Sequence, residues 1–134
     1  MTTQRIPIIS LHGNLIAPIQ GAIADDVMTQ LQADVSQRID TAGARGLIID
    51  VSGVELMDSF MTKNIRDLAL TARLMGVHTV VSGLQPAVAI TLVEMGLEIH
   101  GLTTTLNLER ALLHLEEVQR AEEQIAAEDP DERA

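Results

Sequence analysis

Cysteine, tryptophan and tyrosine are absent from this 134-residue chain, and Phe60 is its single aromatic residue. Without cysteine the chain forms no disulfide and offers no thiolate to a metal ion or a substrate. Without aromatic platforms it cannot bind single-stranded nucleic acid by stacking against the bases. A hydrophobic core must therefore be built from Leu, Ile, Val, Ala and Met.

Basic residues are also scarce, since nine Lys and Arg stand against 19 Asp and Glu, a net charge of −10. Residues 116–134 carry eight acids and two bases, which leaves a charge of −4 for the rest of the chain. This balance disfavours nucleic acids and anionic membrane surfaces as partners. Because residues 122–134 offer little apolar surface, we expect them to form an acidic, disordered tail.

Long hydrophobic runs are missing, and no basic stretch followed by an apolar segment opens the chain. These patterns predict a cytoplasmic protein that does not cross a membrane. A chain of this length builds one domain without metal or disulfide support. We place that domain at residues 1–121.

The most informative stretch is Gly46–Met61, where the hydrophobic pattern changes its period. A short, branched apolar run, Leu47–Val51, is typical of a buried strand. After Ser59, apolar residues recur at helical spacing as far as Met75. Asp58 and Ser59 should therefore lie between a strand and a helix, where unpaired backbone N–H groups favour an oxygen ligand or an anion.

The remaining segments alternate between strand and helix patterns. Two β-like runs around the turn at residues 12–14 predict a hairpin at a sheet edge, with Pro7 and Pro18 in edge or terminal positions. The other expected elements are helices at 23–42, 87–95 and from about 108, and strands at 77–83 and 97–102. This order predicts an α/β fold: a short, mixed, mostly parallel sheet with right-handed β-α crossovers and about four helices.

Signals for catalysis, metal binding or cofactor binding are weak. Ser59 lacks the setting of a hydrolase nucleophile, the four histidines are scattered, and Gly43–Gly46 lacks the residues of a phosphate-binding loop. We therefore predict no enzyme activity, no metal site and no cofactor.

Asp58 and Ser59 are the candidate functional residues. The simplest interpretation of the pair is a helix N-cap alone, because Asp and Ser are strongly preferred there. Met57 and Met61 are either an adaptable contact surface or ordinary core residues, and core filling is the commoner use of methionine. We predict a partner-binding surface made by Met57, Asp58, Phe60 and Met61.

The arrangement of Asp50, Met57-Asp58-Ser59-Phe60 and Leu74-Met75-Gly76 around a strand and an amphipathic helix resembles the STAS domain of bacterial anti-sigma-factor antagonists. Further stretches are similar to its stressosome-scaffold branch, the RsbS-like proteins. They are Ile6-Pro7-Ile8, Ile48-Ile49-Asp50-Val51, Ser82-Gly83-Leu84-Gln85-Pro86-Ala87-Val88-Ala89 and Thr91-Leu92-Val93-Glu94-Met95-Gly96-Leu97. The resemblance covers about residues 5–118.

This resemblance implies a non-enzymatic scaffold and negative regulator of a stress response. By similarity, Ser59 is the acceptor of a phosphoryl group, Asp58 supports it as a cap, and Thr91 is a candidate second acceptor. The implied partners are an RsbT-type switch serine kinase, which is sequestered and then released on phosphorylation, RsbR-type STAS paralogues in a large assembly, and an RsbX-type phosphatase. Alone, the chain is expected to be a dimer or another homo-oligomer.

Two other functions remain open at this point. The chain could be a stand-alone antagonist that binds an anti-sigma kinase outside any large assembly. It could instead be a small-molecule-binding STAS sensor module.

Overall fold

A five-stranded sheet lies at the centre of the computed structural model, which describes residues 5–21, 23–96 and 102–128. The strand order is β1 (Ile9–Leu11), β2 (Asn14–Gln20), β3 (Gly46–Gly53), β4 (His78–Ser82), β5 (Thr103–Thr105). β1 is antiparallel to β2, and all other neighbours are parallel. This confirms the predicted α/β fold with a mixed, mostly parallel sheet.

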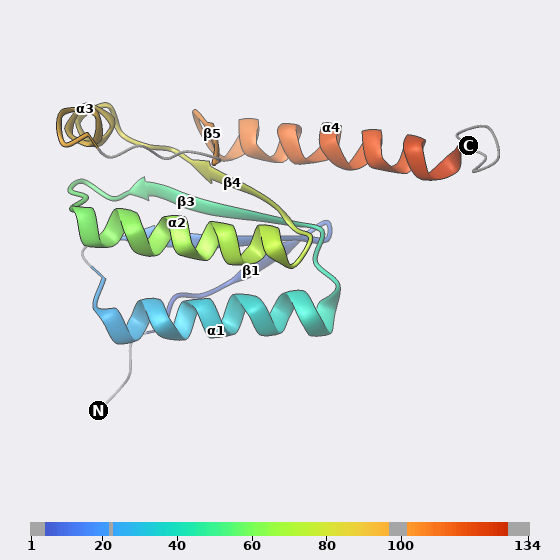
Figure 1. Ribbon diagram of the computed structural model, residues 1–134, viewed down its shortest axis with the longest axis horizontal. Helices are drawn as coiled ribbons and strands as arrows, with labels where there is room; N and C mark the ends of the chain where they lie inside the picture. Colours follow the sequence, from blue (N-terminus) through green and yellow to red (C-terminus); the bar gives the residue numbers. More distant parts are fainter. Residues whose placement is uncertain (1–4, 22, 97–101, 129–134) are drawn as a thin grey trace.

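Four helices complete the described part of the chain: α1 (Asp25–Ala42), α2 (Ser59–Leu74), α3 (Pro86–Glu94) and α4 (Leu108–Ala127). α1 and α2 lie on one side of the sheet and α4 on the other, while α3 lies at one end of the molecule (Figure 1). No helix among the described residues is both long enough and apolar enough to cross a bilayer.

β3 is buried on both faces, as its continuous apolar run predicts. Leu47 and Ile49 belong to the core cluster shared with α1 and α2. Ile48, between them, faces the opposite way and packs with Ala111 and Leu115 of α4. The strand that leads to the candidate site is therefore packed against helices on both of its faces.

The predicted hairpin is present at the sheet edge. Leu11 pairs with Asn14, so His12 and Gly13 form a two-residue turn with positive φ angles of 52° and 82°, as a type I′ turn requires. Pro18 lies in β2, which has neighbours on both sides. The pairing with β1 ends at Ile16, however, so Pro18 has no β1 neighbour that would need its missing N–H.

Residues 97–101 of the strand expected at 97–102 lie outside the described part of the chain, and Leu102, its one described residue, is not in a strand. The last strand among the described residues is Thr103–Thr105, a polar segment whose first two residues are exposed. Threonine suits an edge strand because its branched side chain favours extended backbone while its hydroxyl stays in water. A search for apolar runs cannot find such a strand.

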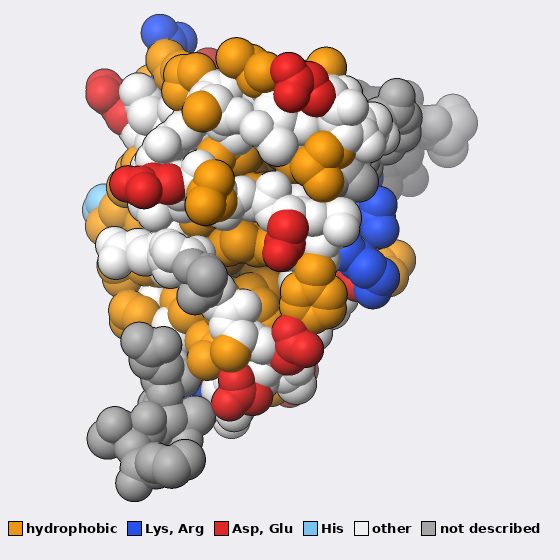
Figure 2. Space-filling view, turned by 90° about the vertical axis from the view of Figure 1, so that its left-hand side faces the viewer, with side chains coloured by type: hydrophobic (Ala, Val, Ile, Leu, Met, Phe, Trp, Pro, Cys, Tyr) orange, Lys and Arg blue, Asp and Glu red, His pale blue; other side chains and the backbone are white. Residues whose placement is uncertain are grey.

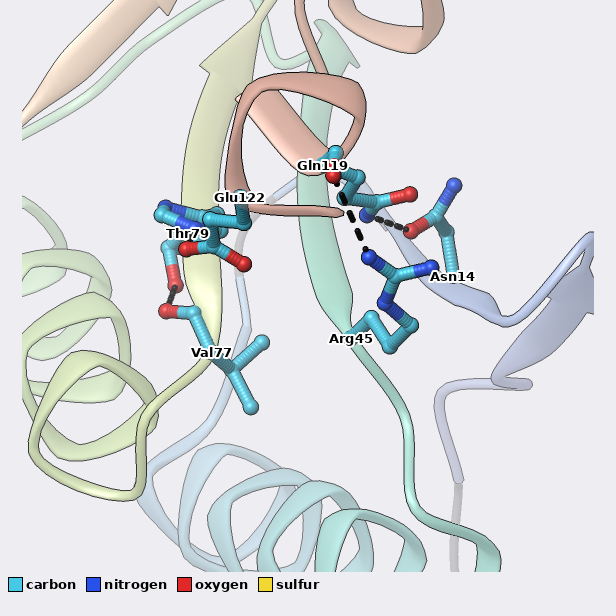
Figure 3. A network of polar contacts seen from close by, with 7 residues as sticks. Asn14, Arg45, Val77, Thr79, Gln119 and Glu122 are labelled. Atoms are coloured by element: carbon cyan, nitrogen blue, oxygen red, sulfur yellow. Dashed lines mark hydrogen bonds and ion pairs between the residues drawn. The ribbon is translucent and has the colours of Figure 1, made fainter. Parts of the chain in front are cut away.

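The acidic tail also needs a correction, because α4 continues to Ala127 and residues 122–127 are helical. Polar contacts hold this end of α4 to the beginnings of β2, β3 and β4. The buried Gln119 Nε2 donates to Asn14 Oδ1 at 2.7 Å (Figure 3), and Arg45 pairs with Glu123 at 2.8 Å. His78 contacts Glu122 in the same region. These contacts supply the anchoring that apolar surface does not, and residues 129–134 lie outside the described part.

Candidate functional site

The candidate site lies where the loop after β3 enters α2. Asp58 has extended backbone angles and is the N-cap of α2. Its Oδ1 accepts a hydrogen bond from the Met61 N–H at 2.7 Å, and its carbonyl oxygen accepts from the N–H and the hydroxyl of Thr62 at 3.0 and 2.8 Å. Asp58 thus satisfies backbone donors that would otherwise lack partners. The predicted capping role of this residue is confirmed.

Ser59 is the first residue of α2 and is exposed. Within the described part of the chain, its hydroxyl has no hydrogen-bond partner. The capping is done by Asp58, so the Ser59 side chain is not needed to begin the helix. A group attached to its oxygen would lie in water, beside the unpaired N–H groups and the positive end of the helix dipole.

The two methionines of the predicted partner surface are largely buried, yet both are among the residues that line the groove at this end of the protein, so their contact role stays a prediction. Met57 is 6% exposed and Met61 is 7% exposed, and both belong to the core cluster under α1 and α2. Their place in the core follows from helical geometry, because Met61 and Ile65 lie on the inner face of α2. Of the four predicted contact residues, Asp58 and Phe60 lie at the surface, with Phe60 48% exposed.

Leu56 was missed by the sequence reasoning, although it is 86% exposed in the loop before Asp58. An isolated leucine between Glu55 and Met57 carries no periodic signal, so only the structure shows that it points away from the core. Together with Phe60 it puts large apolar side chains on both sides of the Asp58-Ser59 pair.

A groove of about 530 Å³ runs beside this pair. One wall is formed by Leu56, Asp58 and Phe60, and the other by Thr91 of α3 and by Met95, the residue that follows this helix. The sequence reasoning did not connect α3 with the site, because the two segments are almost thirty residues apart. Figure 2 faces this end of the molecule and shows hydrophobic side chains interspersed with acidic ones, with Lys and Arg only towards the margins.

Thr91, the candidate second acceptor, is exposed on α3 and lines the same groove as Asp58. Its hydroxyl donates to the Ala87 carbonyl oxygen at 2.9 Å, one turn earlier in the helix. It is therefore accessible at the surface, and its role as an acceptor stays a prediction.

The local charge is negative. Glu55 and Asp58 line the groove, and none of the described residues that line it is a lysine or an arginine. Lys63, one turn into α2, is paired with Asp67 at 3.1 Å. In the described ranges, no cluster of three His, Asp or Glu side chains is arranged to hold a metal ion.

Comparison with known proteins agrees with this geometry. The STAS domain model matches residues 3–111. A variant of RsbS from Moorella thermoacetica, with glutamate in place of a serine, is 34% identical with a TM-score of 0.74, and the match covers 86% of this chain and 97% of that one. A chain from a structure of the stressosome, described as a signal integration and transduction hub, is 33% identical with a TM-score of 0.71, covering 85% of this chain and 99% of that one.

Among curated proteins, the RsbT co-antagonist protein RsbRB of Bacillus subtilis is 30% identical over 112 residues, which is 79% of this chain and 39% of RsbRB. The chain spans 35–39% of the length of the RsbR-type relatives RsbRD and RsbRB. With a family model that matches most of its length, and a 34% identical relative that it covers almost completely, the chain belongs to the STAS domain family.

Proposed function

We propose that this protein is a non-enzymatic scaffold of a stressosome-type assembly and a negative regulator of a bacterial stress response. It sequesters an RsbT-type serine kinase and releases it when Ser59 is phosphorylated. An RsbX-type phosphatase resets the switch, and RsbR-type STAS proteins are its partners in the assembly.

The observation that carries this proposal is the exposure of Ser59 at the start of α2, beside a helix cap that does not use its hydroxyl. A kinase needs the acceptor oxygen to reach its active site, and nothing in the described structure covers or binds this oxygen. The chain itself would supply only the acceptor. ATP and metal ions would come with the kinase.

Electrostatics explains why phosphorylation would change binding more than folding. A phosphate adds about −1.5 to −2 charges at neutral pH. At an exposed helix N-terminus such an anion is stabilised by about 0.3–1 kcal/mol. In an interface the phosphate would lose water beside the Asp58 carboxylate, which costs several kcal/mol per ion without a close partner. The domain therefore tolerates the modification, whereas a protein packed over Ser59 does not.

The relatives support the choice of partners. RsbRB is named as an RsbT co-antagonist, and one of the similar chains comes from a stressosome. Transferred to this chain, these names favour a kinase of the RsbT type and an assembly with other STAS proteins.

The test is incubation of the purified chain with an RsbT-type kinase and Mg-ATP, followed by mass spectrometry of the intact protein and its peptides. We expect one phosphoryl group on Ser59, none on Ser59→Ala, and unchanged labelling of the control Ser52→Ala, which removes another exposed hydroxyl near the site. Labelling of Ser59→Ala at the wild-type level would exclude Ser59. Labelling lost only in Thr91→Ala would move the site to α3.

A phosphomimetic variant tests the release step. Ser59→Asp should weaken kinase binding at least about tenfold, a change of about 1.4 kcal/mol, while the melting temperature changes little. An unfolded Ser59→Asp protein would show that the serine is structural.

A stand-alone antagonist and a stressosome scaffold would form complexes of different size with an RsbR-type paralogue. Light scattering of the chain with and without an RsbR-type paralogue should show a large complex only in the mixture. A monomer or dimer that stays unchanged in the mixture favours the stand-alone antagonist. A small-molecule sensor would instead show a ligand-dependent rise in the melting temperature of the isolated chain.

A further inference from the structure

Two loops begin side by side at one edge of the sheet. One connects β3 to α2 and leads to Ser59, and the other connects β4 to α3. The two strands are parallel neighbours, and Asp50 of β3 is paired with Ser82 of β4, so both loops leave the sheet at the same level. The loop after β3, the start of α2 and the helix α3 all lie at this end of the molecule (Figure 1). A contact between the two loops can therefore fix the chain that leads to Ser59.

Gln85 makes such a contact. It is the N-cap residue of α3, but its side chain does not cap the helix. Pro86 occupies the first helical position and has no N–H that needs an acceptor. The side chain of Gln85 reaches the other loop instead, where Nε2 donates to the Ser52 carbonyl oxygen at 2.7 Å. Glutamine is not among the residues preferred at an N-cap, so capping does not explain its presence here.

Two further contacts bind Ser52. Asp50 Oδ1 accepts a hydrogen bond from the Ser52 N–H at 3.0 Å. Gly83 packs directly on the Ser52 backbone, because a Cβ at Gly83 would lie 2.9 Å from Ser52 Cβ and 3.2 Å from its Cα. The N–H of Gly83 donates to the Thr105 carbonyl oxygen at 3.1 Å, which ties this loop to β5. Ser52 is thus bound from its own strand and from the loop that precedes α3.

The position of Ser52 affects the start of α2 through a short piece of chain. The Val54 N–H donates to the Val51 carbonyl oxygen at 3.0 Å and closes a turn that contains Ser52. The side chain of Val54 is fully buried in the core cluster. Three residues separate Val54 from Asp58, the N-cap of α2. A displacement of the turn is therefore passed on to Asp58 and to the adjacent Ser59.

We infer that Gln85 is a positioning residue for the phosphorylation of Ser59. Through the Ser52 carbonyl group it keeps the loop after β3 in one conformation, so that the Ser59 hydroxyl is presented from a fixed place. Without this hydrogen bond the loop samples other conformations, and the acceptor oxygen is aligned for in-line attack for less of the time. Gln85 itself does not touch the phosphoryl group. Its part in the reaction rests on the proposed function, whereas its effect on the loop does not.

The effect on the loop is tested by amide hydrogen exchange of the full chain, without any partner. Gln85→Met keeps the length of the side chain and removes the donor. The N–H groups of Ser52 and Val54 should then exchange about three- to tenfold faster, the range that corresponds to the loss of one hydrogen bond. Amides in the middle of β3 should be unchanged, which shows that the variant is folded.

Two variants and one further amide complete this experiment. Gln85→Lys supplies a different N–H donor on a long side chain, and it should restore most of the lost protection. Gln124→Met, at an exposed glutamine of α4, should leave the exchange of both loop amides unchanged. The Ala89 N–H, bonded to the Gln85 carbonyl oxygen at 2.9 Å, reports on α3. Faster exchange at Ala89 alone would mean that Gln85 only stabilises its own helix, and it would overturn the inference.

The effect on the reaction is tested by single-turnover labelling with a purified RsbT-type kinase and Mg-ATP. At saturating kinase, Gln85→Met should label Ser59 at least about threefold more slowly, and Gln85→Lys should recover most of the rate. The kinase concentration at half-saturation should stay within about twofold, because a misplaced acceptor slows the chemical step and not the binding step. A change in half-saturation alone would show that Gln85 contributes to binding, and it would contradict positioning.

The outcomes separate this inference from the proposed function. If the wild type is phosphorylated on Ser59 and Gln85→Met is labelled at the same rate, the positioning role is wrong and the function stands. If the loop amides exchange equally in Gln85→Met and the wild type, the hydrogen bond does not fix the loop and the inference is overturned. If the wild type is not phosphorylated on Ser59, the proposed function fails, and the positioning role falls with it.

Discussion

Asp58 accepts a hydrogen bond from the Met61 N–H at 2.7 Å, and this bond lets α2 begin at Ser59 without using the serine hydroxyl. The two adjacent residues therefore have different roles in the site. Asp58 supplies the cap, and Ser59 remains chemically available at the surface.

Removing the cap should destabilise the domain moderately. We expect Asp58→Ala to lower the free energy of unfolding by about 0.5–2 kcal/mol, because the N–H of Met61 loses its acceptor. Asp58→Asn keeps an acceptor oxygen, so its free energy of unfolding should fall much less. Urea denaturation measures both variants, and an equal loss in the two would show that the charge of Asp58 matters rather than its cap.

The hydrogen bond between Gln119 and Asn14 should contribute more to the free energy of unfolding than a hydrogen bond between exposed side chains, since both residues are buried. Gln119→Ala removes a donor from the buried Asn14 amide oxygen and should cost about 1–3 kcal/mol. Gln124→Ala, an exposed glutamine on the same helix, should change stability by less than about 0.5 kcal/mol.

A double-mutant cycle checks the assignment of that bond. The cost of Asn14→Ala together with Gln119→Ala should be smaller than the sum of the single costs, because the second substitution breaks no further bond between the two. Strictly additive costs would mean that the two side chains act independently.

Gly46 should not accept a side chain. A Cβ there would lie 2.5 Å from Asn14 Oδ1 and 2.9 Å from Leu115 Cδ1, inside the packed contact between β3 and α4. We expect Gly46→Ala to cost about 1–3 kcal/mol through overpacking. Gly53→Ala is the control, because its nearest contact is the exposed, flexible side chain of Gln20. A smaller loss of stability in Gly46→Ala than in Gly53→Ala would contradict the close contact of Gly46 with Asn14 and Leu115.

Asp34 should contribute to the pH dependence of stability. Arg5 donates to both of its carboxylate oxygens, at 3.1 and 3.0 Å, and these hydrogen bonds hold the pKa of Asp34 below its usual value. The stabilisation is complete above the unfolded-state pKa of about 3.9, and it is lost as the pH falls through the lower folded-state pKa.

Unfolding measured from pH 2 to 7 checks this sign. Asp34→Asn should be less stable than the wild type at neutral pH and should approach it at the acid end. Asp40 is exposed on the same helix, and the free energy of unfolding of Asp40→Asn should show the same change with pH as that of the wild type. A difference between Asp34→Asn and the wild type that persists unchanged at pH 2 would exclude the ion pair as its cause.

Much of the fold could be predicted because its signals are local. The apolar run of β3, the helical spacing after Ser59 and the Pro86 start of α3 each act within one element, and the structure has all three. The capping preference of Asp58 is likewise a property of a few neighbouring residues. The resemblance to the STAS domain rested on the same stretches.

The errors occurred where the outcome depended on contacts between distant segments. The sequence favoured core filling for Met57 and Met61 but left a contact surface open, and only the packing of α2 against the sheet buries them. The helical turns beyond residue 121 contain little apolar surface, yet Arg45 and His78, from other parts of the chain, pair with them.

Periodicity and capping chemistry thus determined where β3 ends, where α2 begins and which hydroxyl stands at the junction. Tertiary structure alone decided that α3 lies across a groove from Asp58 and Phe60, the sequence neighbours of that serine, and that Leu56 lines the same groove. The reason is physical: a hydrogen bond at a helix cap spans three residues, whereas the walls of a groove are brought together only when the whole sheet assembles.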